Sequence, residues 1–482
     1  MTVTHSFTRD SRIIGALAGT AFGDALGSTY EFQPPVPPEQ PVSFRANGTW
    51  QRGEWTDDTA MAIAIAKASA LGDLADDAIQ NHIIHNWLTW MATSKDVGIQ
   101  TRHVLGQISA DPSAENCRAT ALLFHAQTGR SAGNGSLMRT APVALAFLNE
   151  PEKRAQVARA VSSLTHADVL AGDACVLWVD AIARSIETGT LASPRDSIEL
   201  LPEERRATWL EYINQAETLM PWDFENNGFV VSAFQAAWSA ISHTSGEPEA
   251  GGLHAIRAIE LAVHCGWDTD TVAAIAGSLV GAAYGIESLP VTGLRHLHGW
   301  GADNIVELSA IALKAAHRPV SDATVVDLSP YPQSTQRATL PAEPAITLGG
   351  QSVARESGSF DFIVSLSRIG TAECPLQSPH HTSVRVLDSH FKSENPNLVT
   401  TMIHVADALS EAVEEGKRVL LHCVQAHTRT PSFAAAYLIW SQGMSATDAQ
   451  ADVLRALPHA DFHSPFDEAL RELEKLGMRL RP

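Results

Sequence analysis

Apolar residues recur every three or four positions through most of the first 318 residues of the chain. This spacing places them on one face of a helix, whereas a half-buried strand alternates apolar and polar side chains. Such alternation is nearly absent from this part of the sequence. The pattern therefore predicts an all-α region, with helices expected over residues 79–91, 118–127, 154–164, 168–186 and 229–241.

The pattern changes near residue 360, where short runs rich in β-branched and other apolar residues begin. Phe360–Leu366 and Arg418–His422 are candidate strands, and the amphipathic stretch Leu398–Glu415 between them is a candidate helix. The segment before them mixes Pro, Ser, Thr and Gly as linkers do, although part of it is compatible with an edge strand. We predict an all-α domain over residues 10–318, a linker over 319–349 and an α/β domain over 350–482.

Composition limits the class of protein. The chain has 482 residues, of which 45% are apolar, so it can bury two sizeable cores. It carries 54 acidic and 34 basic residues and a formal net charge of −20, which argues against general nucleic-acid binding. Five widely spaced cysteines without a CxxC pattern indicate reduced thiols in the cytoplasm, and no segment has the pattern of an export signal or membrane span.

Two acidic clusters each open an apolar run of small residues. The first is Trp55–Thr59 (WTDDT) and the second is Gly266–Thr271 (GWDTDT). Their carboxylates are expected at helix N-caps and in first turns, where ordinary capping is the simplest explanation. Capping needs only one side chain per helix, however, and adjacent carboxylates repel unless they share a proton or a cation. The clusters therefore favour one metal site built from two helix N-termini, with oxygen ligands that suit Mg²⁺, Mn²⁺ or Ca²⁺.

Glycines recur at every fourth position in two stretches. They are Gly15, Gly19, Gly23 and Gly27 near the start of the chain, and Gly277, Gly281 and Gly285 after the second acidic cluster. Each glycine destabilises a helix interior by about 1 kcal/mol. We therefore expect both stretches to be helices whose glycines allow a neighbouring backbone to pack closely, with a glycine-rich loop as the alternative for Ile13–Gly27.

The two acidic clusters, together with Gly23–Gly27 (GDALG) and Gly133–Arg139 (GNGSLMR), resemble the motifs of the ADP-ribosylglycohydrolase family. This family includes the hydrolase that reactivates ADP-ribosylated dinitrogenase reductase, and the four motifs occur here in the family's order. The resemblance covers roughly residues 10–318. It implies an orthogonal helical bundle with a metal site in a cleft, and hydrolysis of the bond between ADP-ribose and an acceptor.

The resemblance also implies roles for individual residues. Two Mg²⁺ ions, with Mn²⁺ as the alternative ion, are expected to be held by Glu31, Thr56, Asp57, Asp58, Asp268, Asp270 and Thr271. Glu31 and Asp57 are the candidates for a carboxylate that stays free to act as acid or base. ADP-ribose is expected to contact Gly133, Asn134, Gly135, Ser136 and His166. Backbone N–H groups of such a glycine-rich loop suit a diphosphate, whereas His166 has a purely structural role as its alternative.

A second chemical motif follows the candidate strand that ends at His422. In HCVQAHTRTP, five residues separate Cys423 from Arg429. Inward N–H groups, a helix N-terminus that lowers the pKa of the thiol and a forked guanidinium all suit a phosphate group. The pattern resembles the dual-specificity, cysteine-dependent phosphatases over about residues 350–480. That resemblance implies Cys423 as nucleophile, Arg429 as phosphoryl-binding residue and Asp388 as general acid. The family usually has Gly where this chain has Ala426, so an inert phosphate-binding module is the alternative.

The sequence thus predicts a bifunctional protein. One domain is expected to be a Mg²⁺-dependent hydrolase of an ADP-ribosylated protein or small molecule, and the other to act on a phosphorylated substrate. The alternative is an ADP-ribose sensor that recruits targets to the phosphatase. The acidic set favours the hydrolase, because a binding module has no need of so many metal ligands. The acceptor stays open between arginine, serine, a nucleic-acid end and a metabolite.

Overall fold

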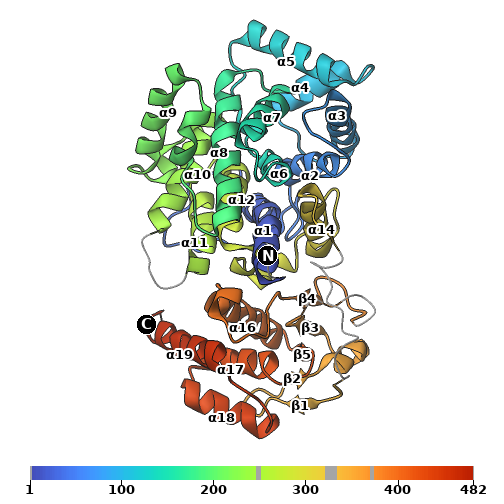
Figure 1. Cartoon of the computed structure of the whole chain (residues 1–482), viewed down its shortest axis with the longest axis vertical. Helices are drawn as coiled ribbons and strands as arrows, with labels where there is room; N and C mark the ends of the chain where they lie inside the picture. The colour runs from blue at the N-terminus through green and yellow to red at the C-terminus, as the bar shows by residue number, and fades with distance from the viewer. Residues whose placement is uncertain (1–2, 246–250, 321–333, 368, 370–373, 481–482) are drawn as a thin grey trace. The chain divides into compact units, whose positions relative to one another are not determined.

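The computed structural model describes residues 3–245, 251–320, 334–367, 369 and 374–480. The chain divides into two compact units (Figure 1). The helical unit comprises His5–Ile286 and Leu297–Val320, and the C-terminal unit comprises mainly Glu287–His296 and Ser321–Pro482. The helical unit therefore ends at Val320, about where the helical periodicity stops, and Glu287–His296, from within the predicted helical domain, belongs to the other unit.

The helical unit contains the helices that the periodicity predicts. Its main helices are α1 (Val3–Gly27), α2 (Asp57–Ser69), α3 (Asp77–Met91), α4 (Ile99–Ile108), α5 (Ala114–Thr128), α6 (Ala141–Ala146), α7 (Pro151–Ser163), α8 (Val169–Thr188), α9 (Glu203–Ala216), α10 (Val230–Thr244), α11 (Gly251–Val263), α12 (Thr269–Tyr284) and α14 (Ile305–Ala315). Short 3₁₀ turns connect several of them, among which η1 (Asn134–Ser136) matters for the site. Every expected helix of this region overlaps one of these elements, so the prediction of an all-α fold is confirmed here.

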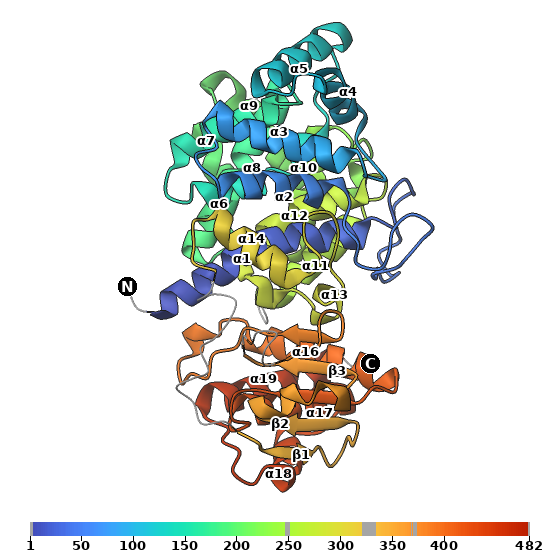
Figure 2. The same ribbon diagram turned by 90° about the vertical axis from the view of Figure 1, so that its right-hand side faces the viewer.

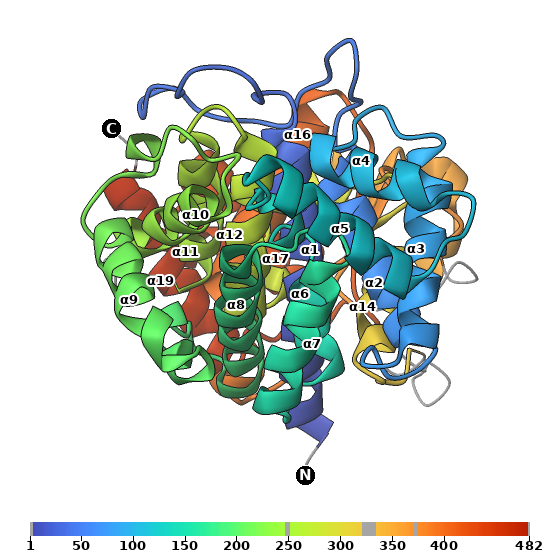
Figure 3. The same cartoon turned by 90° about the horizontal axis from the view of Figure 1, so that it is seen from above.

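Helix α1 forms the interior of the helical unit. Every residue from Ile13 to Gly27 is buried, and Figure 3 shows α1 surrounded by other helices of the same unit. Helices α1 and α12 lie side by side, as Figure 2 shows. A Cβ atom added to Gly19 would lie 2.0 Å from the carbonyl oxygen of Gly277, and one added to Gly277 would lie 2.1 Å from that of Gly19. The glycines thus allow direct backbone contact between two helices, and the alternative of a loose glycine-rich loop is excluded.

The C-terminal unit is built on a five-stranded sheet with strand order β1-β2-β5-β3-β4. Its strands are β1 (Arg337–Thr339), β2 (Ile346–Gly349), β3 (Phe362–Ser365), β4 (His381–Ser383) and β5 (Val419–His422). All neighbouring pairs are parallel except β1 with β2. In this register Ile363 lies opposite Leu420, so both side chains point to the same face of the sheet.

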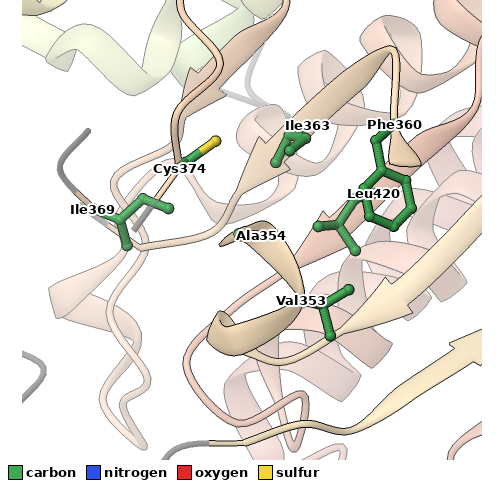
Figure 4. Close-up of a cluster of buried hydrophobic side chains, with 7 residues drawn as sticks. All are labelled: Val353, Ala354, Phe360, Ile363, Ile369, Cys374 and Leu420. Carbon is green, nitrogen blue, oxygen red and sulfur yellow. The ribbon is translucent and has the colours of Figure 1, made fainter. Parts of the chain in front are cut away.

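That face is covered by a buried apolar cluster (Figure 4). Ile363 and Leu420 pack there with Phe360 and with Val353 and Ala354 of the 3₁₀ turn η5 (Gln351–Arg355). Figure 1 shows helices of this unit gathered to one side of the strands. They are α16 (Leu398–Glu414), α17 (Arg429–Gln442), α18 (Ala446–Ala456) and α19 (Ser464–Leu480). The sheet is therefore buried by different elements on its two faces, as expected for an α/β unit.

The range expected to be a linker, residues 319–349, contains two strands of the sheet, β1 and β2, while residues 321–333 lie outside the described part of the chain. Strand β1 is an edge strand, as the sequence allowed, whereas β2 lies inside the sheet. Each strand has only three or four residues, too few for an alternating pattern to emerge between prolines. No helix of the described residues is both long and apolar enough to cross a bilayer.

Candidate active site

The two acidic clusters meet in the helical unit, although their residues are more than 200 positions apart. Thr56 is the N-cap of α2 and Asp58 lies in its first turn, while Asp270 lies in the first turn of α12. The Thr56 hydroxyl donates to Asp58 Oδ2 at 3.0 Å and also lies 3.3 Å from Asp270 Oδ2. The expected assembly of one site from two helix N-termini is therefore present in the structure.

These carboxylates do not serve as ordinary caps of their own helices. Neither Thr56 nor Asp268, the N-cap residues of α2 and α12, makes a side-chain capping hydrogen bond. The N-terminus of α2 is instead capped by Asp24, which lies in α1. Its Oδ1 accepts from the Thr56 N–H at 2.8 Å, and its Oδ2 accepts from the N–H and hydroxyl of Thr59 at 2.9 and 2.6 Å. The simple capping explanation for the clusters is thus excluded.

Asp24 is a site residue that sequence reasoning missed. It lies within the GDALG motif, but its spacing within a glycine-rich helix gives no separate sign of function. The structure shows why a carboxylate is needed there. A fully buried acceptor with two oxygens satisfies three donors at the start of α2 and thereby fixes Thr56, Asp57 and Asp58 relative to α1.

Two groups of three carboxylates have the spacing of metal ligands. One consists of Asp24, Asp58 and Asp270, and the other of Glu31, Asp268 and Asp270, with the ligand atoms of each group within 4.8 Å of one another. Asp270 belongs to both. In addition, Asp58 Oδ1 is buried and accepts no hydrogen bond from the described residues. A buried, unpartnered carboxylate oxygen and an all-oxygen donor set fit Mg²⁺ or Mn²⁺.

Three of the expected ligands, Thr56, Asp57 and Thr271, lie beside these groups and not within them. Asp57 is outside both triads, and the Gly98 backbone N–H donates a hydrogen bond to it. The Thr271 hydroxyl lies 3.7 Å from the sulfur of Met138, and its backbone N–H donates to Asp270 Oδ1 at 2.9 Å. The structure therefore brings all seven expected residues to one place, but it separates Asp57 from the two groups with ligand spacing.

Burial and mutual repulsion disturb the acid–base equilibria of these carboxyl groups. Burial, reinforced by the charges of Asp268 and Asp96, raises the pKa of Glu31 to about 9. Burial, followed by the charge of Asp96, raises the pKa of Asp57 to about 8, and burial raises that of Asp24 to about 6 against its hydrogen bonds. The pKa values of Asp58 and Asp270 are raised well above the usual range for the same reasons, burial first. Without cations, the cluster therefore retains protons at neutral pH.

The raised pKa values predict that the metal-free protein loses stability as the pH rises. A group with a raised pKa in the folded state stabilises the fold below its unfolded pKa of about 4 and loses that contribution as the pH passes its folded pKa. We expect the Tm in EDTA to fall between about pH 4 and 9, because Asp24, Asp57 and Glu31 keep their protons in the folded chain up to about pH 6, 8 and 9. The measurement is thermal unfolding of the full chain, and Asp57→Asn should flatten the fall. A Tm in EDTA that is constant or rises over this range would contradict the prediction.

The glycine-rich loop joins the acidic cluster through Asn134. The Asn134 side-chain amide donates to Asp268 Oδ2 at 2.7 Å and to the carbonyl of Asn227 at 2.9 Å. Ser136, by contrast, is fully buried and hydrogen-bonds to Ser162, so its side chain does not face a ligand. Of the expected ADP-ribose contacts in this loop, Asn134 therefore offers a side chain beside the acidic cluster, and Ser136 offers only its backbone.

His166 packs directly against the same loop. Cβ atoms added to Gly133 or Gly135 would lie 3.2 and 3.1 Å from its imidazole ring, so glycine is needed for this contact. The ring is buried and hydrogen-bonds to Thr165, and burial holds the pKa of His166 well below its usual range. The histidine is therefore neutral and packs against Gly133 and Gly135, which agrees with the structural alternative for this residue.

The second motif lies in the C-terminal unit, where Cys423 follows β5 and Arg429 begins α17. The Arg429 guanidinium donates to the carbonyls of Leu366 and Val386 at 2.8 and 3.2 Å. Its Nε lies 3.6 Å from Asp388 Oδ2, and the other oxygen of Asp388 lies 3.3 Å from His463 Nε2. The three residues expected to carry phosphatase chemistry thus belong to one unit, with Asp388 beside Arg429.

Ala426 adopts the backbone conformation that its position suggested. It has φ +57°, in the left-handed region that glycine adopts without penalty and alanine does not. The departure from the resembled phosphatases at this position therefore has a physical consequence. The loop keeps its left-handed turn in this structure, but with a residue that strains it.

Comparison with known proteins now places the helical unit. The ADP-ribosylglycohydrolase family model matches residues 5–321, and the chain belongs to this family of enzymes. The chain is 26% identical to the ADP-ribosylarginine hydrolase Tri1 of Serratia proteamaculans over 57% of this chain and 72% of that protein. It is 27% identical to the ADP-ribosyl-[dinitrogen reductase] glycohydrolase of Rhodospirillum rubrum, over 58% and 87% of the two chains. Among solved structures, human DUSP28 aligns with 30% of this chain and 97% of its own, at 22% identity and a TM-score of 0.26.

Proposed function

We propose that the helical unit removes ADP-ribose from ADP-ribosylated arginine with the help of two divalent cations. Mg²⁺ is the proposed ion, and Mn²⁺ is the alternative. The observation that carries the metal site is the pair of carboxylate triads that share Asp270. Arginine as acceptor is supported by the similarity to a protein named ADP-ribosylarginine hydrolase. An acidic site also suits a cationic guanidinium better than a neutral hydroxyl.

The residues of the site divide into three roles in this proposal. Asp58, Asp268 and Asp270 hold the cations, which when bound would orient the ribose hydroxyls and lower the pKa of a water molecule. The backbone N–H groups of the loop around Asn134 hold the diphosphate. The Asn134 side-chain amide, which donates to Asp268 and Asn227, ties this loop to the acidic cluster, and the buried neutral His166 keeps the loop in place. Water is thereby positioned against the bond that is cleaved.

Asp57 is our choice for the free acid or base. Of the two carboxylates with this expected role, Glu31 belongs to a triad with ligand spacing, whereas Asp57 belongs to neither. In the metal-free site, burial followed by the charge of Asp96 raises the pKa of Asp57 to about 8, so this carboxyl group holds a proton that it could give at neutral pH. Asp57 would protonate the leaving nitrogen of the acceptor, as cleavage of a glycosidic bond requires.

The direct test uses purified full-length chain with arginine-ADP-ribosylated and serine-ADP-ribosylated protein, each with Mg²⁺ or with EDTA. The quantity measured is free ADP-ribose. Mg²⁺-dependent release from the arginine substrate is the expected result. Release from the serine substrate alone would overturn the choice of acceptor. Tight binding of ADP-ribose without release from either substrate would instead support the sensor alternative.

A second candidate function, in the C-terminal unit, is cysteine-dependent phosphate ester hydrolysis. The observation that favours it is that Asp388 lies next to Arg429. Arg429 is the first residue of α17, the helix that follows the Cys423 loop. In this reaction Cys423 Sγ would bond to phosphorus as the bond to the leaving oxygen breaks. Asp388 would supply the proton to that oxygen, and water would then hydrolyse the thiophosphate.

This second candidate predicts separable activities. Cys423→Ser should remove hydrolysis of an aryl phosphate while leaving ADP-ribose release unchanged, because the thiolate is the only nucleophile proposed for that reaction. Ala426→Gly should retain hydrolysis and raise the Tm slightly, since glycine removes a left-handed strain of about 1 kcal/mol. The measurements are aryl phosphate turnover and thermal unfolding of each full-length variant. Equal turnover by wild type and Cys423→Ser would rule out a cysteine phosphatase.

A further inference from the structure

Two large aromatic side chains are exposed directly beside the acidic site. Phe32, which follows Glu31, is 78% exposed, and Trp267, which precedes Asp268, is 40% exposed. Glu31 and Asp268 belong to the same carboxylate triad. Both aromatic residues are therefore next in sequence to candidate metal ligands, at the solvent side of the site.

Both aromatic residues also have strained backbones. Phe32 and Trp267 each have φ +61°, a conformation that bulky side chains rarely adopt. Each such residue is strained relative to an ordinary backbone conformation. Burial of the ring could offset this strain, but the Phe32 ring is largely exposed and the Trp267 ring is only partly covered. Backbone strain that is not offset by packing is typical of functional sites.

The two residues form one backbone unit. The Phe32 N–H donates to the Trp267 carbonyl at 2.6 Å, and the Trp267 N–H donates to the Gln33 carbonyl at 2.7 Å. The contact continues at Gly266, where an added Cβ would lie 2.4 Å from the nitrogen of Pro35. The segment after Glu31 is thus fixed to the segment before Asp268. This pairing fixes the positions of the residues that carry the two aromatic side chains and the two carboxylates relative to one another.

We propose that Phe32 and Trp267 bind the guanidinium group of the arginine acceptor and make the helical unit selective for it. This inference rests on the proposed function and names the residues that recognise its leaving group. A guanidinium is planar and cationic, so it can stack on aromatic faces while neighbouring carboxylates attract it. Asp96 is close enough to this side of the site for its charge to influence Glu31. The diphosphate end of the substrate is assigned to a different element, the loop that contains Asn134.

The test compares Trp267→Gly and Phe32→Gly with wild type. Glycine suits a φ of +61°, so neither variant should lower the Tm, which separates recognition from folding. We expect kcat/KM on the arginine substrate to fall roughly 3- to 30-fold, the range that one cation–π contact supplies. The fall should appear mainly in KM, and Trp267→Phe should recover most of it. Leu122→Ala, at a 59% exposed apolar position on α5, is the control and should behave as wild type.

Two further readouts distinguish the possible failures. The affinity for free ADP-ribose should be unchanged in both glycine variants, because ADP-ribose lacks the acceptor. If that affinity falls by the same factor as kcat/KM, the aromatic pair binds the nucleotide and the inference is wrong. Unchanged kcat/KM on the arginine substrate would also overturn it, while leaving the proposed function standing. Failure of wild type to release ADP-ribose from that substrate would overturn the proposed function and the inference together.

Discussion

Asp270→Ala is expected to reduce Mg²⁺-dependent release of ADP-ribose by at least about a hundredfold, because metal assistance is worth several kcal/mol of the barrier. Asp270 is the one carboxylate common to both triads, so its removal disturbs both candidate cation positions at once. Asp58→Ala and Glu31→Ala each remove a carboxylate from only one triad. We therefore expect smaller losses from them, partly recovered at high Mg²⁺ concentration. The measurement is kcat/KM over a series of Mg²⁺ concentrations.

Substitution of Asp270 should, in contrast, increase the stability of the metal-free protein. Asp270 is buried among Glu31, Asp58 and Asp268, whose charges help to raise its pKa after burial itself. Asp270→Asn removes that repulsion and should raise the Tm in EDTA, while weakening the stabilisation by Mg²⁺. Asp77→Asn is the matched control, because Asp77 is a first-turn aspartate of α3 with a largely exposed side chain. Full activity of Asp270→Ala, or equal Mg²⁺ stabilisation of Asp270→Asn and wild type, would contradict the metal site.

Sequence reasoning succeeded where local pattern and tertiary structure agree. The long periodic stretches are helices, and the two acidic clusters lie at the N-termini of α2 and α12, as expected. That the clusters meet could be inferred from their matching chemistry. The sharing of Asp270 between two triads could not, since it depends on the angle and spacing of two helices that are distant in sequence.

The features that sequence reasoning missed depend on tertiary context. Asp24 caps a helix to which it does not belong, so no local capping signature marks it. Phe32 and Trp267 appear unremarkable as residue types, and their left-handed backbones become visible only when the two segments pair. Strands β1 and β2 are too short for periodicity and become strands through pairing with β5 and with each other. In each case the missing information is a partner that is remote in the chain.

Gly19→Ala and Gly277→Ala are expected to destabilise the protein by roughly 3 kcal/mol or more, at or beyond the upper end of ordinary overpacking. At both positions the new methyl group would meet a carbonyl oxygen of the opposite helix, at 2.0 and 2.1 Å. A backbone atom cannot change rotamer as a side chain can, so α1 and α12 would have to separate. The measurement is the free energy of unfolding from denaturant titration of each full-length variant.

Gly106→Ala provides the matched control, because Gly106 lies within α4 and an added Cβ would meet no atom within 4 Å. There alanine should stabilise the protein by about 0.5–1 kcal/mol, since it restricts the unfolded chain and favours the helix. The variant with alanine at both Gly19 and Gly277 should lose less stability than the sum of the single losses, because one separation of the helices relieves both contacts. Additive losses, or a stabilising Gly19→Ala, would show that the helices do not touch through their backbones.

The same contact also links packing to chemistry. Helix α1 carries Asp24 and α12 carries Asp270, so a separation of the two helices moves carboxylates that must stay within ligand distance. Metal sites tolerate displacements of only a few tenths of an ångström. We therefore expect Gly19→Ala to lower Mg²⁺-dependent turnover even at temperatures where the variant is fully folded, whereas Gly106→Ala should leave turnover unchanged. The close glycine contact is then a condition for the geometry of the active site as well as for the stability of the fold.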